Sequence, residues 1–194
     1  DFVMIESYCN ADQEGQGKLL TRTDWMKLIA KGTAEDVPEE NLVYSVTQGV
    51  PNEMRASIWT ILAKIKKMKS QNSKFLYERL CKVNSKWDMY IDKDVPRTRN
   101  NEPFFKKPEY GTSDKLTRIL KAYAAFDPEL GYTQGMNEIV CVVLMVMSNY
   151  NPSNQYQDTL QIPKSAEKNT FWILVYLMQE LKYKLGLGVQ DTVD

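Results

Sequence analysis

The longest apolar run in the chain is a stretch of nine residues, Ile139–Met147. A helix formed by Glu138–Met147 would be apolar on every side, so we expect a central helix that the rest of the fold buries. The run is far shorter than the roughly 20 residues needed to cross a bilayer. We therefore expect a soluble protein with neither a transmembrane segment nor a signal peptide.

Helical periodicity extends through much of the remaining sequence. A short helix is expected after a cap at Thr23 or Asp24, with Gly32 as its stop. A longer helix is expected to begin near Pro51, a residue suited to a first turn. Its apolar positions repeat at helical spacing, and they are Met54, Ile58, Ile61, Leu62 and Ile65.

Further helices are predicted over residues 73–84, 113–126 and 169–185, the second of them capped by Ser113 or Asp114. Residues 87–105 contain two prolines and cannot form one continuous helix. Residues 148–165 are expected to form a loop. Because no strand pattern and no internal repeat is found, we predict an all-α fold of six or seven helices. Residues 1–40 would be a lead-in with a short helix, and residues 41–194 the main domain.

Composition excludes several classes of chemistry. The chain has no histidine, which removes Ser-His-Asp and Cys-His catalysis and histidine metal sites. Its three cysteines, Cys9, Cys81 and Cys141, are far apart and form no C-x-x-C pair. We therefore expect no metal site and no disulfide framework, and a reducing cytosol fits. Cys141 should pack as a small apolar residue.

The charges balance overall but not locally. Lysine plus arginine number 25, as do aspartate plus glutamate, so no general attraction to nucleic acid is expected. Residues 51–110 nevertheless hold 14 basic and seven acidic residues. This basic middle third is either a set of solvated helix faces or a surface for an anionic partner.

Residues 10–21 briefly imitate a calcium-binding loop through Asn10, Asp12 and Glu14. The twelfth position is Thr21 instead of the glutamate that such loops use. A polar lead-in is therefore the better interpretation.

Three short patterns stand out along the main domain: Arg55-x-x-x-Trp59, Ile91-x-x-Asp94-x-x-Arg97 and Tyr132-x-Gln134-Gly. Each has a plain structural explanation. Arg55 can pair with a carboxylate, Trp59 can fill the core, Arg97 can be a solvated loop residue, and Gln134 can cap the helix that follows it.

Taken together and in this order, the patterns resemble the TBC domain of GTPase-activating proteins for Rab GTPases. "QGVPNEMRASIW", "IDKDVPRT" and "GYTQGMN" each look like a motif of that family. The resemblance covers residues 48–180 approximately. It implies an irregular multi-helix domain that accelerates GTP hydrolysis by a Rab-type GTPase in its GTP form, with a role in vesicle trafficking.

The resemblance also implies the roles of individual residues. Arg97 would be the arginine finger and Gln134 the glutamine finger, both acting in trans on the partner's nucleotide. Asp94 would accept from Arg97 or Arg55 and so aim the finger. The residues expected to support this corner are Arg55, Trp59 and Tyr132. GTP and Mg²⁺ would belong to the GTPase, so the chain would have no cofactor of its own.

Two further expectations follow. The sequence stops soon after the last predicted helix, which suggests a TBC domain without its C-terminal helical lobe, and residues 186–194 look like a fraying tail. The alternative function is a catalytically silent TBC-fold scaffold or Rab-binding module. In either case we expect a regulator without substrate turnover of its own, located in the cytoplasm and peripheral at membranes through its GTPase partner.

Overall fold

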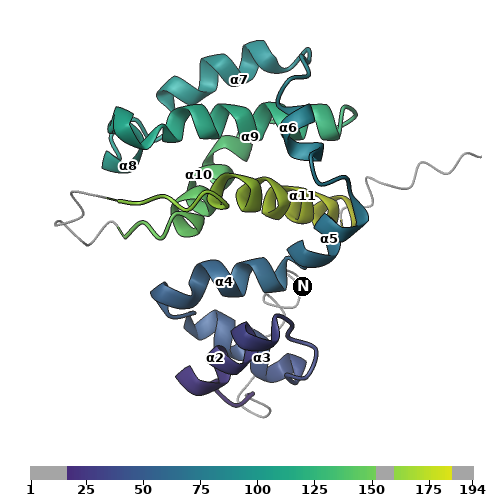
Figure 1. The fold of residues 1–194 in the computed structure, drawn as a ribbon, viewed down its shortest axis with the longest axis vertical. Coiled ribbons are helices and arrows are strands. Elements are labelled where there is room, and N and C mark those ends of the chain that lie inside the picture. Colours follow the sequence, from purple (N-terminus) through teal and green to yellow (C-terminus); the bar gives the residue numbers. More distant parts are fainter. Residues whose placement is uncertain (1–16, 152–159, 185–194) are drawn as a thin grey trace, which may run out of the picture. The chain divides into compact units, whose positions relative to one another are not determined.

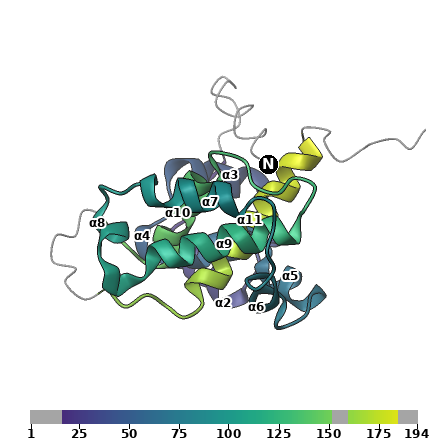
Figure 2. The ribbon, with the colours of Figure 1, turned by 90° about the horizontal axis from the view of Figure 1, so that it is seen from above.

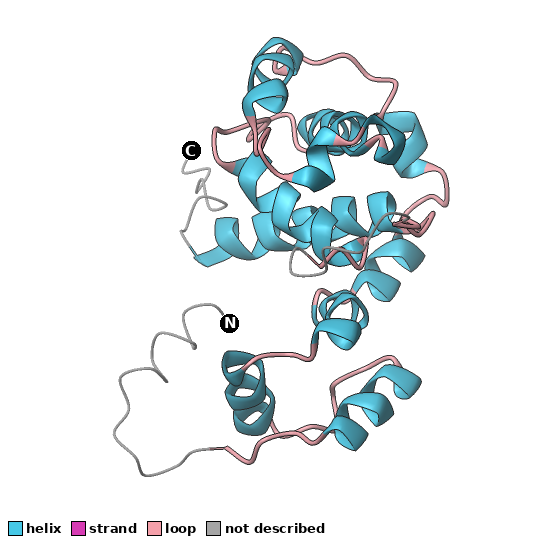
Figure 3. Ribbon diagram, turned by 90° about the vertical axis from the view of Figure 1, so that its left-hand side faces the viewer, coloured by secondary structure: helices cyan, strands magenta, loops and turns pink. Residues whose placement is uncertain are grey.

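The computed structural model describes residues 17–151 and 160–184, with side chains described up to residue 180. Within these residues the chain forms helices and loops and no strand, as Figure 3 shows, and the predicted all-α class is confirmed. The calcium-like residues at 10–15, residues 152–159 of the predicted loop and the tail at 186–194 lie outside the described part.

The chain divides into two compact units, one ending at Leu62 and the other starting at Ala63. Each unit is described separately below. The predicted domain boundary after residue 40 stays a prediction.

The first unit contains α2 (Arg22–Lys31), α3 (Glu39–Gln48) and α4 (Asn52–Leu62). Helix α2 is capped by Thr21, so the predicted cap at Thr23 or Asp24 is wrong. Thr21 Oγ1 accepts a bond from the Asp24 N–H, and the Asp24 carboxylate accepts one from the Thr21 N–H, which forms a capping box. The helix ends, as expected, at Gly32, which has φ 74°.

The core of this unit forms where α2 meets α4. Its fully buried members are Trp25, Leu28, Val50, Met54 and Ile58. The predicted helical spacing from Met54 is therefore correct as far as Leu62.

The predicted long helix does not continue beyond Leu62. Lys64 has φ 51°, a left-handed conformation that ends the regular helical bonding, and α5 (Ile65–Gln71) starts after it. The apolar pattern does not reveal this break. Ala63 and Ile65, on either side of Lys64, are both buried. An apolar pattern predicts which residues are buried, but it does not detect a single left-handed residue that ends a helix.

The second unit continues with α6 (Leu76–Leu80), α7 (Asp88–Asp94) and the 3₁₀ turn η1 (Val95–Arg97). Next come α8 (Pro103–Lys106), the 3₁₀ turn η2 (Pro108–Tyr110), α9 (Thr112–Phe126), α10 (Met136–Met147) and α11 (Ala166–Lys184). These helices are shorter and more numerous than the six or seven predicted. Helices α9, α10 and α11 pack against one another, and α7 lies along α9 (Figures 1 and 2).

The prediction that the helix of Glu138–Met147 is buried on every side is wrong for α10. Val140, Cys141, Val143 and Leu144 are buried, but the exposed fractions of Ile139 and Val142 are 37% and 41%. Within the described residues, α9 and α11 cover only part of the helix, so it is not buried on every side. Cys141 packs in the core as expected, and burial raises its pKa to about 12.

Helix α9 begins one residue earlier than predicted and without the expected cap from Ser113 or Asp114. Its N-cap is Gly111, and the buried Thr112 hydroxyl donates to the carbonyl of Phe104 at 2.6 Å. A tertiary hydrogen bond therefore fixes the start of this helix.

A glycine next to an indole fixes the chain before α10. Gly131 has φ 64°, and a Cβ atom there would collide with the indole of Trp87, the residue before α7. Its N–H donates to the Asp127 carbonyl at 2.7 Å. Gly135 has φ 103° and open space around the corresponding position. Of these two glycines, Gly131 is therefore the one constrained both by its backbone and by a neighbour.

A polar cluster holds α6, α9 and α11 together. Glu167 accepts bonds from the Tyr77 hydroxyl at 2.6 Å and from Arg118 at 2.7 and 2.9 Å. Burial opposes ionisation of Glu167, but the hydrogen bonds from Arg118 and Tyr77 outweigh it. The pKa of Glu167 therefore lies below its ordinary value of 4.5.

We expect G131A to destabilise the second unit by about 2–4 kcal/mol, because it adds both a steric collision and a positive-φ penalty. G135A is the matched control: it carries the positive-φ penalty alone and should cost only about 1 kcal/mol. Urea unfolding followed by circular dichroism measures both values. Equal losses for the two variants would contradict the Trp87 contact.

We expect E167Q to lower the free energy of unfolding by about 1–3 kcal/mol at neutral pH. Because the folded pKa is depressed, the contribution of the carboxylate is present above the unfolded pKa and is lost as pH falls through the folded pKa. The gap between wild type and E167Q should therefore shrink in urea titrations as the pH falls below the ordinary value of 4.5. The exposed Glu129 provides the control E129Q, which should change stability by less than about 0.5 kcal/mol.

Candidate functional site

A buried carboxylate at the end of α7 is the centre of the candidate site. Asp94 is 7% exposed, and its Oδ1 forms an ion pair with Arg97 Nη2. Its Oδ2 accepts a bond from the Tyr132 hydroxyl at 2.7 Å. The Arg97 side chain is 67% exposed. A carboxylate fixed in the interior thus holds a guanidinium that faces solvent.

The local sequence explains how Arg97 reaches this position. Pro96 has no N–H to continue α7, and the chain tightens into the 3₁₀ turn η1. Thr98 closes the turn, because its N–H donates to the Val95 carbonyl at 3.1 Å and its hydroxyl donates to the Asp94 carbonyl at 2.6 Å. The turn places Arg97 three residues beyond the carboxylate with which it pairs.

A second bridge joins this turn to the start of α10. Asn137 Nδ2 donates to Thr98 Oγ1 at 2.8 Å, and both residues are buried. Asn137 Oδ1 in turn accepts the Gly135 N–H at 3.0 Å. The segment bearing Arg97 and the segment bearing Gln134 are therefore joined by two buried hydrogen bonds, Tyr132–Asp94 and Asn137–Thr98, and by an ion pair between Arg99 and Glu138.

Sequence reasoning did not assign a role to Thr98 or Asn137. Both were visible as the last letters of "IDKDVPRT" and "GYTQGMN". Thr98 stands between Arg97 and Arg99, and Asn137 is followed by Glu138, so the local sequence gives no sign that either residue is buried.

Gln134 lies at the exposed corner between Gly131 and Gly135. The N-cap of α10 is Gly135, and the side chain that bonds to its N–H is Asn137. The structural alternative in which Gln134 caps this helix is therefore not observed. Gln134 is presented to solvent by a loop whose two ends are fixed by packing and hydrogen bonds.

Tyr132 is the buried link between the two segments. Burial raises the pKa of its hydroxyl well above the usual range, and the hydrogen bond to Asp94 and the charge of that carboxylate raise it further. The hydroxyl is therefore protonated at neutral pH and donates to Asp94.

Arg55 and Trp59 belong to α4 in the first unit. Arg55 Nη2 donates to the Val50 carbonyl at 3.0 Å, so its partner there is a backbone oxygen and not a carboxylate. Trp59 is half-buried. Of the two arginines considered for Asp94, Arg97 is the one paired with it. The supporting role of Arg55 and Trp59 stays a prediction.

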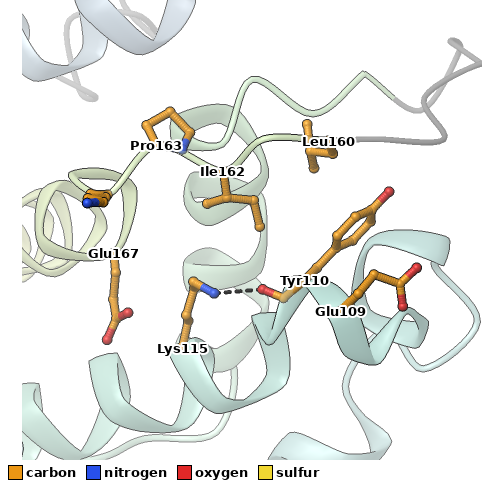
Figure 4. A pocket seen from close by; sticks show the side chains of 8 residues that line it. Glu109, Tyr110, Lys115, Leu160, Ile162, Pro163 and Glu167 are labelled. Carbon is orange, nitrogen blue, oxygen red and sulfur yellow. Dashed lines mark hydrogen bonds between the residues drawn. The ribbon is translucent and has the colours of Figure 1, made fainter.

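A cavity of about 380 Å³ lies elsewhere in the second unit, between the start of α9 and the chain before α11 (Figure 4). The residues that line it include Tyr110, Lys115, Ile162, Pro163 and Glu167. Lys115 Nζ donates to the Tyr110 carbonyl at 2.6 Å, as the dashed line shows. None of the predicted site residues lines this cavity, so the candidate site is an exposed corner.

Two other kinds of feature are absent from the part of the chain that the structure describes. No group of three or more Cys, Asp or Glu side chains is arranged to hold a metal ion there. No helix in that part of the chain is long and apolar enough to cross a membrane. The expected absence of a metal site stays a prediction.

The chain is similar to known proteins over most of its length. The family model for the Rab-GTPase-TBC domain matches residues 52–186. The human ecotropic viral integration site 5 protein homolog is 29% identical over 146 residues, which are 75% of this chain and 15% of that protein. The GTPase-activating protein GYP5 of Eremothecium gossypii is 34% identical over 117 residues, or 60% of this chain and 12% of that protein. The chain thus spans a small part of these relatives.

A solved structure shows the same fold. The crystal structure of the Chlamydomonas flagellar RabGAP TBC domain superposes with a TM-score of 0.59 at 24% identity. The match covers 80% of this chain and 48% of that one. Since the family model matches well over half of its residues, the chain belongs to the Rab-GTPase-TBC domain family.

Proposed function

We propose that this chain activates GTP hydrolysis by a Rab-type small GTPase in its GTP form, with Arg97 and Gln134 acting in trans. The observation that carries the proposal is the arrangement around Asp94. An exposed arginine is paired with a buried carboxylate, and the same carboxylate is bonded to the segment that bears Gln134. Membership of the Rab-GTPase-TBC family supports the choice of partner.

The chemistry explains what such a corner would supply. Negative charge spreads over the γ-phosphoryl oxygens in the transition state, and a slow GTPase lacks a cation there. An arginine supplied in trans is worth roughly 10³–10⁵ in rate. That range corresponds to about 4–7 kcal/mol of the barrier.

Arg97 suits this role because its guanidinium is always charged and carries five N–H donors. The bond to Asp94 uses the Nη2 end of the guanidinium, so donors remain for a phosphate. Asp94 cannot turn freely, since its other oxygen accepts from Tyr132. The finger is therefore oriented before the partner arrives, and less entropy is lost on binding.

Gln134 would position the attacking water in place of the GTPase's own glutamine. A primary amide donates and accepts, so it can hold the water and a phosphate oxygen together. Its loop is fixed by Gly131 against Trp87 at one end and by Asn137 at the other. The folded unit itself, and not the partner GTPase, would thus set the distance between Arg97 and Gln134.

GTP and Mg²⁺ would be bound by the GTPase, and we propose no cofactor for this chain. Its residues would contribute charge and orientation to a nucleotide held by another protein. In this role the chain regulates an enzyme and has no substrate turnover of its own, and it would reach membranes through the GTPase.

We expect R97A and R97K each to slow stimulated hydrolysis at least tenfold, and Q134A to do the same, since each removes one transition-state contact. R97K is informative because lysine keeps the charge but loses the planar fork. Single-turnover GTP hydrolysis with a panel of Rab GTPases measures the effect. Circular dichroism should show that each variant is folded. Thermal unfolding should be unchanged for Q134A, whose side chain is exposed, and should move to lower temperature for R97A, which leaves the buried Asp94 without its cationic partner.

The matched controls are R22A and Q161A, which remove the same side chains from exposed positions outside the corner. Both should keep the wild-type rate. If the Arg97 and Gln134 variants stimulated GTP hydrolysis as strongly as the wild type, the two-finger mechanism would be contradicted. Rab binding without any acceleration by the wild-type chain would favour the silent scaffold instead.

The positioning role of Asp94 has its own test. We expect D94N to slow stimulated hydrolysis about tenfold, because the amide cannot form the charge-assisted bond to Arg97. If Asp94 acts through Arg97, the double variant D94N/R97A should be no slower than R97A, within about twofold. Losses that multiply across the two sites would show that Asp94 acts independently of Arg97.

A further inference from the structure

A strongly basic segment of the second unit has no part in the proposed mechanism. Residues 64–82 contain seven basic side chains and a single acidic one, Glu78. The basic residues are Lys64, Lys66, Lys67, Lys69, Lys74, Arg79 and Lys82. This segment forms α5, α6 and their flanking turns.

Three contacts attach α5 and α6 to the start of α11. Lys69 Nζ donates to Asn169 Oδ1 at 2.6 Å, and the Tyr77 hydroxyl donates to Glu167. Glu78 forms an ion pair with Lys168. The single acidic side chain of the segment is therefore already neutralised by a lysine from another helix.

The outward-facing residues of this segment remain in solvent. We define the α5–α6 surface as the exposed residues Lys66, Lys67, Lys74, Phe75 and Arg79. Figure 2 shows α5 and α6 at one corner of the unit, while α8 lies at its other end. The buried residues Ile65 and Tyr77 anchor the two helices from the inside.

Cations are crowded next to this surface. Burial lowers the pKa of Lys69, and the nearby charge of Lys168 lowers it further. An anionic surface brought to this corner would relieve that repulsion, and each lysine or arginine near an anionic membrane is worth about 1 kcal/mol.

Phe75 adds an apolar element. It is 61% exposed, and the ammonium of Lys74 lies 5.8 Å from the centre of its ring. A large exposed aromatic ring next to a lysine suits the interface of a bilayer. The ring can enter the headgroup region while the ammonium groups stay at the charged surface.

We propose that the α5–α6 surface binds anionic lipid bilayers directly. Lysine-rich charge fits a fluid array of headgroups, which requires no fixed fork geometry. Single-stranded nucleic acid would instead call for several aromatic rings to stack bases, and this surface offers Phe75 alone. The proposal goes beyond GTPase activation and does not depend on it.

Vesicle co-sedimentation tests the proposal with the whole chain. Wild type should bind phosphatidylcholine vesicles containing about 30% phosphatidylserine at least tenfold more tightly than pure phosphatidylcholine vesicles. Raising the salt from about 0.1 M to about 0.5 M should remove most of this preference by screening. K66E/K67E should bind the anionic vesicles at least tenfold more weakly, and F75A severalfold more weakly.

The matched control is K18E/K106E, which changes the net charge equally at two exposed lysines outside the α5–α6 surface. It should keep its affinity within about twofold. Circular dichroism establishes that each variant is folded, and K66E/K67E should keep its activity toward a GTPase in solution. Three results would each overturn the proposal: equal binding to both kinds of vesicle, equal losses in the two double variants, or displacement of bound vesicles by RNA at low concentration.

Discussion

The arrangement of the second unit around the candidate site depends on the buried carboxylate of Asp94. Removing a carboxylate from water costs several kcal/mol unless strong donors replace the lost hydration. Asp94 obtains its donors from two places, Arg97 on the following turn and Tyr132 from a segment 38 residues further along the chain. The carboxylate is stable only when both segments are in place, so its burial makes their relative position a condition of folding.

The same condition would suit a protein that acts on a partner's nucleotide. Such a site needs no cavity of its own, and the cavity in this unit is lined by other residues. It needs two polar side chains at a fixed spacing on an exposed corner. Hydrogen bonds beneath the surface, Tyr132 to Asp94 and Asn137 to Thr98, supply that rigidity while Arg97 and Gln134 stay in solvent.

The sequence was informative wherever a pattern depended on local chemistry. Helical spacing predicted the all-α class. The family resemblance left two partners open for Asp94, Arg97 or Arg55, and Arg97 is the one observed. Tertiary contacts decided the rest. The break at Lys64 leaves apolar periodicity intact, and the exposure of Ile139 and Val142 depends on which helices cover α10. The Asn137–Thr98 bond joins residues 39 positions apart, which one sequence cannot pair.

The unit uses its cations in two different ways, and the difference follows from what surrounds them. Arg97 is bonded to a buried carboxylate and so has a defined direction, as catalysis at a single phosphorus atom would require. Lys66 and Lys67 on α5 and Lys74 in the turn before α6 are exposed point charges, a form suited to an anionic surface whose charges move. Catalysis requires a cation held in one direction, whereas binding to a bilayer requires cations that are free to move. The two functions that we propose therefore use different residues and can coexist in one small unit.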